Sequence, residues 1–122
     1  MLVTHYEQIT QKPVDMPGYS GCRIRWLMGV PDGAPTFSLR QFEVAPGGQS
    51  PRHFHNYEHE IFVLEGRGEI LENETPHPLA PGDIVLIKPN EIHQFKNTGQ
   101  APLKFLCVVP HSALDATVTV VP

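Results

Sequence analysis

Histidine side chains carry the chemistry that this sequence is best equipped to perform. The chain has seven histidines in 122 residues. His53 and His55 are two positions apart, so on a β-strand both side chains point to the same face. His59 follows after a short turn, and His93 lies in an alternating segment far along the chain. Because imidazole is the commonest transition-metal ligand, we expect these four histidines to converge inside a β-structure and hold one divalent metal ion.

The elements that position these histidines are expected to be short β-strands. Thirteen prolines and ten glycines interrupt the chain every few residues, which long helices cannot tolerate. Alternating or apolar runs recur between these breaks at intervals of roughly 8–12 residues, a spacing typical of sandwiches and barrels. We therefore predict an all-β fold. The predicted strands are Arg23–Met28, Thr36–Val44, His59–Glu65, Glu69–Glu72, Asp83–Ile87, Ile92–Lys96, Leu103–Val109 and Thr117–Val121.

The first three histidines belong to a longer pattern of fixed spacing. Gly47 is followed by five residues, His53-Phe54-His55, three residues, His59, six residues and Gly66. This run resembles the first motif of the cupin superfamily, which reads G, five residues, H-x-H, three or four residues, E, six residues, G. One position departs from the motif, because His59 stands where the family usually has glutamate.

The fourth histidine belongs to a second pattern of the same family. The second cupin motif reads G, five residues, P-x-G, two residues, H, three residues, N. Gly82, His93 and Asn97 follow its spacing, but Lys88 and Asn90 replace the usual proline and glycine of the central triplet, with Pro89 between them. The resemblance implies a double-stranded β-helix, or jelly-roll barrel, with residues 1–122 forming one cupin domain around a motif core at 47–97. It further implies a small cupin with an all-histidine site, for which the resemblance favours manganese or iron; zinc, nickel and copper suit the same ligands.

The fourth metal ligand has an alternative in the adjacent carboxylate, Glu60. Neighbouring residues on a strand point to opposite faces, so His59 and Glu60 cannot both face the barrel interior. His59 keeps the six-residue gap to Gly66, whereas Glu60 shortens it to five. We favour His59 and keep Glu60 as the alternative.

Three further residues are candidates for contact with a substrate. Phe105 and Cys107 share one face of a predicted strand, which we place toward the cavity; plain core packing is the alternative. Arg40 lies within an apolar run, and an inward guanidinium would bind a substrate carboxylate with two hydrogen bonds. The alternative is an outward Arg40 paired with an acidic residue.

Composition argues against several classes of protein. The formal net charge is −4 and no lysine or arginine run is present, so we expect no binding to a nucleic-acid backbone. No segment approaches the roughly 20 apolar residues of a membrane helix, and residues 1–10 lack the pattern of a secretory signal. Cys22 and Cys107 are expected to be reduced thiols in a cytoplasmic protein.

One predicted strand is apolar on both of its faces. The run Ile61-Phe62-Val63-Leu64 does not alternate, as a strand with one solvent-facing side would. One face must pack the barrel interior while the other is covered by a second sheet or a second subunit. We therefore expect a homodimer.

These features together favour a metal-dependent enzyme acting on a small polar organic substrate, with either dioxygenase-like or isomerase-like chemistry. Cupin barrels support many chemistries, so the fold does not select the reaction. The alternative is a non-catalytic barrel that binds a small molecule or a metal.

Overall fold

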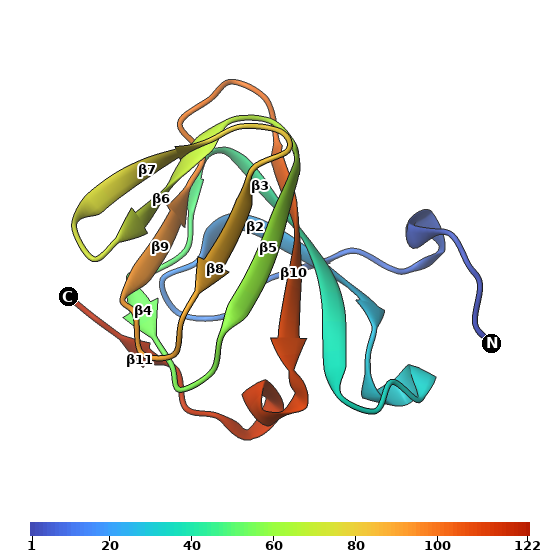
Figure 1. The fold of residues 1–122 in the computed structure, drawn as a ribbon. Coiled ribbons are helices and arrows are strands. Elements are labelled where there is room, and N and C mark those ends of the chain that lie inside the picture. The colour runs from blue at the N-terminus through green and yellow to red at the C-terminus, as the bar shows by residue number, and fades with distance from the viewer.

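The computed structural model describes all 122 residues and shows an all-β chain (Figure 1). Every strand pairing is antiparallel. The only helical segments are short 3₁₀ turns, none of which is long or apolar enough to span a bilayer. The strands are β1 Lys12–Pro13, β2 Ser20–Met28, β3 Phe37–Gln49, β4 His53–Phe54, β5 His59–Glu65, β6 Gly68–Glu72, β7 Thr75–Leu79, β8 Ile84–Ile87, β9 His93–Lys96, β10 Leu103–Pro110 and β11 Thr119–Val120. The 3₁₀ turns are η1 Tyr6–Gln8, η2 Val30–Asp32 and η3 His111–Asp115.

The strands form one sheet that rolls around its own interior. Its main path runs β11-β4-β9-β3-β10-β5-β8, while β2 pairs with β1 and β3, and β6 pairs with β7 and β9. Figure 1 shows β6, β7 and β9 on the left of the molecule and β3 and β10 on the right, with the interior between them. A strongly curled antiparallel sheet of this kind is a β-barrel, as the sequence predicts.

Every second side chain along β10 points inward and packs in the barrel interior. Leu103, Phe105, Cys107 and Val109 are each at most 2% exposed, and the residues between them are only half-buried. The strand lies between β3 and β5, so its inward side chains contact both neighbours. The predicted parity of this segment is therefore correct.

Three strands were not predicted, and β7 shows why. Its five residues include Pro76 and Pro78, which signal breaks in a sequence because proline cannot donate to a ladder. The strand pairs only with β6 and is therefore an edge, where the missing donors are tolerated. The other two, β1 and β4, have only two residues each, which is too short to show a period.

The turn between β5 and β6 depends on a glycine. Gly66 has a φ of 81°, in the left-handed region that favours glycine. An added Cβ would also collide with the backbone carbonyl oxygen of Pro102. This turn therefore fixes where the strand that carries His59 ends.

Replacing Gly66 with alanine is expected to lower the free energy of unfolding by about 3 kcal/mol, because left-handed strain and a backbone collision add together. Gly82→Ala is the matched control. Gly82 has a similar φ of 90° but no atom within 4 Å of an added Cβ, so only the strain of about 1 kcal/mol applies. Equal losses for the two variants in chemical denaturation would contradict this description of the turn.

Candidate metal centre

Three histidines from separate segments bring their ring nitrogens together. His53 on β4, His55 just after it and His93 on β9 each offer a nitrogen, and these atoms lie within 4.8 Å of one another. All three side chains are buried, with exposed fractions of 4%, 3% and 2%. Pairing between β4 and β9 places His53 directly opposite His93, with ring centroids 4.3 Å apart. Strand register therefore joins the two halves of the site.

Each of these three rings is held by the same kind of hydrogen bond. The Nδ1 atom lies within hydrogen-bond distance of a backbone carbonyl oxygen two residues away. A carbonyl only accepts, so Nδ1 carries the proton and Nε2 keeps its lone pair. The pairs are His53 with Pro51 at 2.7 Å, His55 with Tyr57 at 2.8 Å and His93 with Glu91 at 2.8 Å.

The free nitrogens suit a transition metal. Nε2 of His55 and Nε2 of His93 are buried and have no hydrogen-bond partner in the protein, an arrangement that costs free energy unless something else binds them. Burial lowers the pKa of His55 to about 4 and that of His93 to about 3, and it also lowers the pKa of His53. All three rings are therefore neutral at pH 7, as metal ligation requires.

The fourth expected ligand, His59, lies beside this group but has different neighbours. Its ring centroid is 4.6 Å from that of His55 and 5.4 Å from that of His93. It is not one of the three residues whose nitrogens all lie within 4.8 Å of one another. Its Nδ1 is 3.3 Å from Arg40 Nη2 and 3.2 Å from Cys107 Sγ. Burial, and then the charge of Arg40, hold its pKa well below the usual value.

Glu60, the alternative carboxylate ligand, lies on the outer face of β5. Along β5, His59 and Ile61 are buried while Glu60 between them is exposed. Glu60 pairs with Leu86 of β8 and borders an outer surface depression. In this structure Glu60 does not reach the histidines.

The three substrate-contact candidates all line the cavity that contains the histidines. The cavity has a volume of about 110 Å³, and Arg40, Phe105 and Cys107 are among its lining residues. Arg40 points inward, contacting Cys107 Sγ at 3.0 Å, and makes no ion pair. An outward Arg40 paired with an acid is therefore wrong. Burial raises the pKa of the Cys107 thiol, against the opposing effect of Arg40.

The cavity has a positive and aromatic character. None of its lining residues is aspartate or glutamate, so the Arg40 charge has no carboxylate there to balance it. Phe105 stacks between Phe42 and Phe95, with ring centroids 5.4 Å and 4.6 Å apart. Such a cavity favours an anionic or electron-rich ligand with a flat apolar part.

Other residues that line the histidine cavity were not predicted from the sequence. Phe42 is two residues from Arg40 on β3, so the same parity would have placed it on the cavity side. Tyr19 precedes β2 and has no periodic neighbour that would indicate its position. Its ring lies 6.3 Å from that of His53, and burial raises its pKa to about 12.

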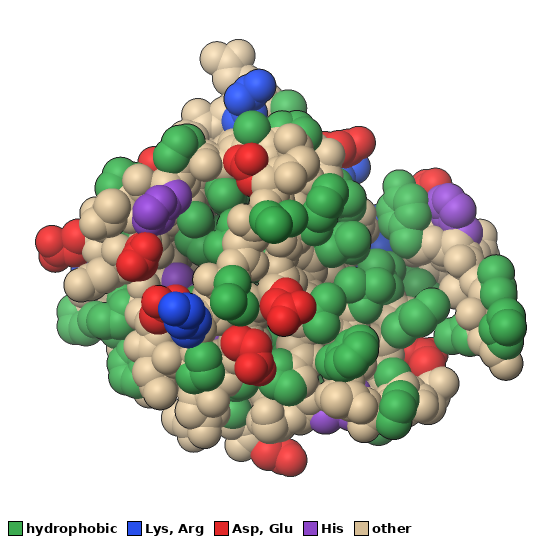
Figure 2. All heavy atoms as spheres, viewed as in Figure 1, with side chains coloured by type: hydrophobic (Ala, Val, Ile, Leu, Met, Phe, Trp, Pro, Cys, Tyr) green, Lys and Arg blue, Asp and Glu red, His purple; other side chains and the backbone are tan.

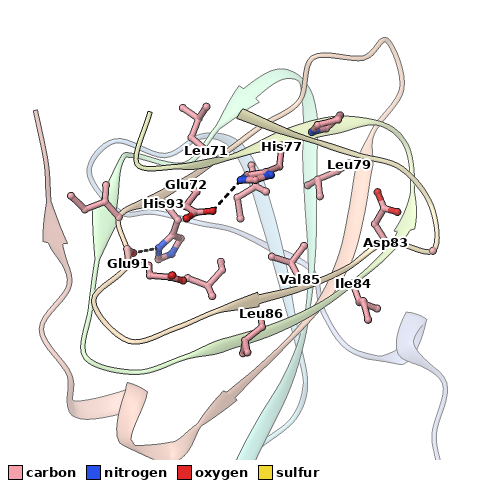
Figure 3. A pocket seen from close by; sticks show the side chains of 15 residues that line it. Leu71, Glu72, His77, Leu79, Asp83, Ile84, Val85, Leu86, Glu91 and His93 are labelled. Carbon is pink, nitrogen blue, oxygen red and sulfur yellow. Dashed lines mark hydrogen bonds and ion pairs between the residues drawn. The ribbon is translucent and has the colours of Figure 1, made fainter. Parts of the chain in front are cut away.

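A larger groove shares His93 with this cavity but otherwise has different lining residues. It lies between the β6–β7 hairpin and β8 and has a volume of about 520 Å³. Figure 3 shows His93 at one end of the groove and Asp83 at the other, with His77 paired to Glu72 between them. His77 and Glu72 are both exposed, so this pair is a solvated surface contact of small energetic weight.

Comparison with known proteins agrees with the barrel and its histidine motifs. The family described as "Cupin domain" matches residues 40–109. The polyketide cyclase RemF from Streptomyces resistomycificus has a similar solved structure, with a TM-score of 0.86 and 36% identity, covering 90% of this chain and 79% of that one.

Two curated relatives have quite different names. The 1-methylthio-D-xylulose 5-phosphate methylsulfurylase of Rhodospirillum rubrum is 39% identical over 61% of this chain and 47% of its own length. The oxalate-binding protein of Thermotoga maritima is 33% identical over 57% of this chain and 58% of its own length. The match thus spans about half the length of these two relatives.

Proposed function

This chain belongs to the cupin family, and we propose that it is a metal-dependent enzyme acting on a small polar organic substrate. One observation carries the proposal: buried, neutral imidazoles with unpartnered Nε2 atoms converge in a cavity that contains no carboxylate. A bound divalent ion would supply a Lewis acid that polarises a carbonyl or enolate oxygen of the substrate.

We propose that the ligand set is His53, His55, His59 and His93. His53, His55 and His93 have the convergence described above, and Nε2 of His55 and Nε2 of His93 have no partner in the protein. His59 is the histidine on the inward face of β5, with its ring in edge contact with those of His55 and His93. Four nitrogen ligands suit several divalent transition metals. Manganese or iron is our expectation from the family resemblance.

The substrate is proposed to be anionic, with Arg40 as its partner in the cavity. Four neutral imidazoles leave the charge of a divalent ion uncompensated, and Arg40 adds a further positive charge. An anion that bridges the two is favoured by both. The stacked Phe42, Phe95 and Phe105 would hold its apolar part and exclude water from it.

Among reactions, we propose isomerase-like chemistry, with ring closure as the favoured form. Polarising a carbonyl oxygen is the common requirement of enolisation and of carbon–carbon ring closure. The likeness to a polyketide cyclase, at 36% identity over most of both chains, supports this choice. A cavity of about 110 Å³ would accept the reacting end of such a substrate rather than the whole of it.

Two other functions are the competing candidates. Dioxygenase-like oxidation is favoured by the all-histidine ligand set, which resembles oxygen-activating centres. A non-catalytic binder of small anions is favoured by the relative named an oxalate-binding protein. The isomerase-like enzyme, the dioxygenase and the binder differ in whether they consume oxygen and whether they release a product.

Metal content tests the proposed ligand set. His59→Ala is expected to lose most of the bound metal, because it removes a ligand, whereas Glu60→Ala should keep the wild-type content because Glu60 faces outward. Elemental analysis of untagged protein measures both variants and identifies the metal. Full metal content in His59→Ala would remove that residue from the ligand set.

Turnover tests the proposed chemistry. Metal-loaded protein is mixed with a panel of small diketones, keto acids, dicarboxylates and catechols, with an oxygen electrode and mass spectrometry as readouts. We expect conversion without oxygen uptake, at constant mass or with loss of water, and weaker binding of the anionic members by Arg40→Gln. Oxygen uptake would replace the isomerase-like reaction with oxidation. Thermal stabilisation without any product would favour the binder.

We also propose that the chain forms a homodimer through the outer face of β5, β8 and β10. Phe62, Ile84 and Leu86 are exposed at 46%, 77% and 56% on this face. They border a shallow depression whose lining is apolar except for Glu60. Hydrophobic side chains are numerous over this side of the molecule (Figure 2). An apolar face of this kind is typical of an interface.

Leu86→Lys is expected to convert the dimer to a monomer in sedimentation velocity, since it would bury a charge at the contact. Val30→Lys is the matched control, because Val30 is similarly exposed, at 53%, but lies on η2 away from this face. A monomeric wild type, or a dimeric Leu86→Lys, would contradict the proposed interface.

A further inference from the structure

His59 differs from the other three histidines in what holds its Nδ1. Each of the others has a backbone carbonyl oxygen at 2.7–2.8 Å. His59 has no such carbonyl. Its Nδ1 neighbours are the sulfur of Cys107 at 3.2 Å and Nη2 of Arg40 at 3.3 Å. The orientation of this ring therefore depends on side chains alone.

The tautomer of the His59 imidazole decides which of these two neighbours can bond to Nδ1, and in which direction. A guanidinium only donates hydrogen bonds. If Arg40 donates to Nδ1, the ring proton lies on Nε2, and that nitrogen cannot bind a metal. For Nε2 to be a ligand, Nδ1 must carry the proton and donate it, and the one acceptor in contact is the Cys107 sulfur. Arg40 can then donate to the same sulfur, which lies 3.0 Å from its Nη2.

We propose that Cys107 is a positioning residue for the metal site: its sulfur accepts the Nδ1–H of His59 and so directs the Nε2 lone pair to the metal. Cys107 thereby takes the place that backbone carbonyls take for the other three histidines. The inference rests on the proposed function, in which His59 is the fourth ligand.

Strand register brings these three side chains together. Cys107 on β10 lies directly opposite Arg40 on β3, and its partner on β5 is Ile61, two residues from His59. All three side chains line the one cavity. Cys107 is 2% exposed, so bulk solvent has little access to its sulfur.

A sulfur acceptor orients the ring of His59 less firmly than a carbonyl oxygen would, which affects the strength of the bond between His59 and the metal. A thiol sulfur is a weak acceptor compared with a carbonyl oxygen, and Arg40 competes for the same Nδ1. His59 is therefore the least firmly oriented of the four ligands. This agrees with its place outside the group of three whose nitrogens lie within 4.8 Å of one another.

Zinc affinity tests the role of Cys107. Cys107→Ala is expected to bind Zn²⁺ about 10–100-fold more weakly, the usual effect of removing a group that orients a ligand. Cys107→Ser, which keeps an acceptor, should recover most of the affinity. Cys22→Ala is the matched control, because Cys22 is also a buried cavity cysteine but its thiol hydrogen-bonds only to the carbonyl oxygens of Ser20 and Gln49. If Cys107→Ala does not fold, Cys107→Val removes the acceptor while keeping the cavity filled.

A double-mutant comparison distinguishes an effect of Cys107 on the orientation of His59 from a general loss of structure at the metal site. In a His59→Ala background, Cys107→Ala is expected to cause no further loss of affinity, and the visible spectrum of bound Co²⁺ should change in the same way in both single variants. Wild-type affinity in Cys107→Ala, or an equal loss in both backgrounds, would overturn the inference while leaving His59 as a ligand. Wild-type affinity in His59→Ala would instead overturn the four-histidine site, and the role of Cys107 with it.

Discussion

The site depends on one repeated interaction, the hydrogen bond from a histidine Nδ1 to a backbone carbonyl oxygen two residues away. His53, His55 and His93 each make it. The bond fixes the tautomer, orients the ring and leaves Nε2 to face the cavity. Burial then keeps the rings neutral, since the charged form would lose its hydration. A bound cation would stabilise the Nε2 atoms of His55 and His93, which have no partner in the protein, and this is the basis of the proposed chemistry.

The barrel supplies the register on which those bonds depend. Pairing of β4 with β9 sets His53 against His93, and the alternation along β5 turns His59 inward and Glu60 outward. A slip of one residue in β5 would replace the neutral imidazole of His59 with the carboxylate of Glu60 on the inward face of the strand. The turn at Gly66 holds the end of this strand. The charge of the cavity therefore follows from strand register.

Much of this arrangement is predictable from the sequence, because motif spacing and strand parity are local properties. The strand His59–Glu65, the inward side of Cys107 and the convergence of His53, His55 and His93 all follow from them. What the sequence does not encode locally is which strands become neighbours. The contact among Arg40, Cys107 and His59 joins β3, β10 and β5. The sequence therefore predicted neither the two competing partners of His59 nor its separation from the other three histidines. Tyr19 lies before β2 and outside any alternating run, so no sequence pattern indicates that it lines the cavity.

A crystal structure of the metal-loaded protein, with data collected at the absorption edge of the metal, would test whether the four histidines hold one metal ion. We expect one anomalous peak in the cavity, bonded to Nε2 of His53, His55, His59 and His93, with Nδ1 of His59 facing Cys107. A peak bonded to three histidines with His59 turned away, or no peak in the cavity, would contradict it.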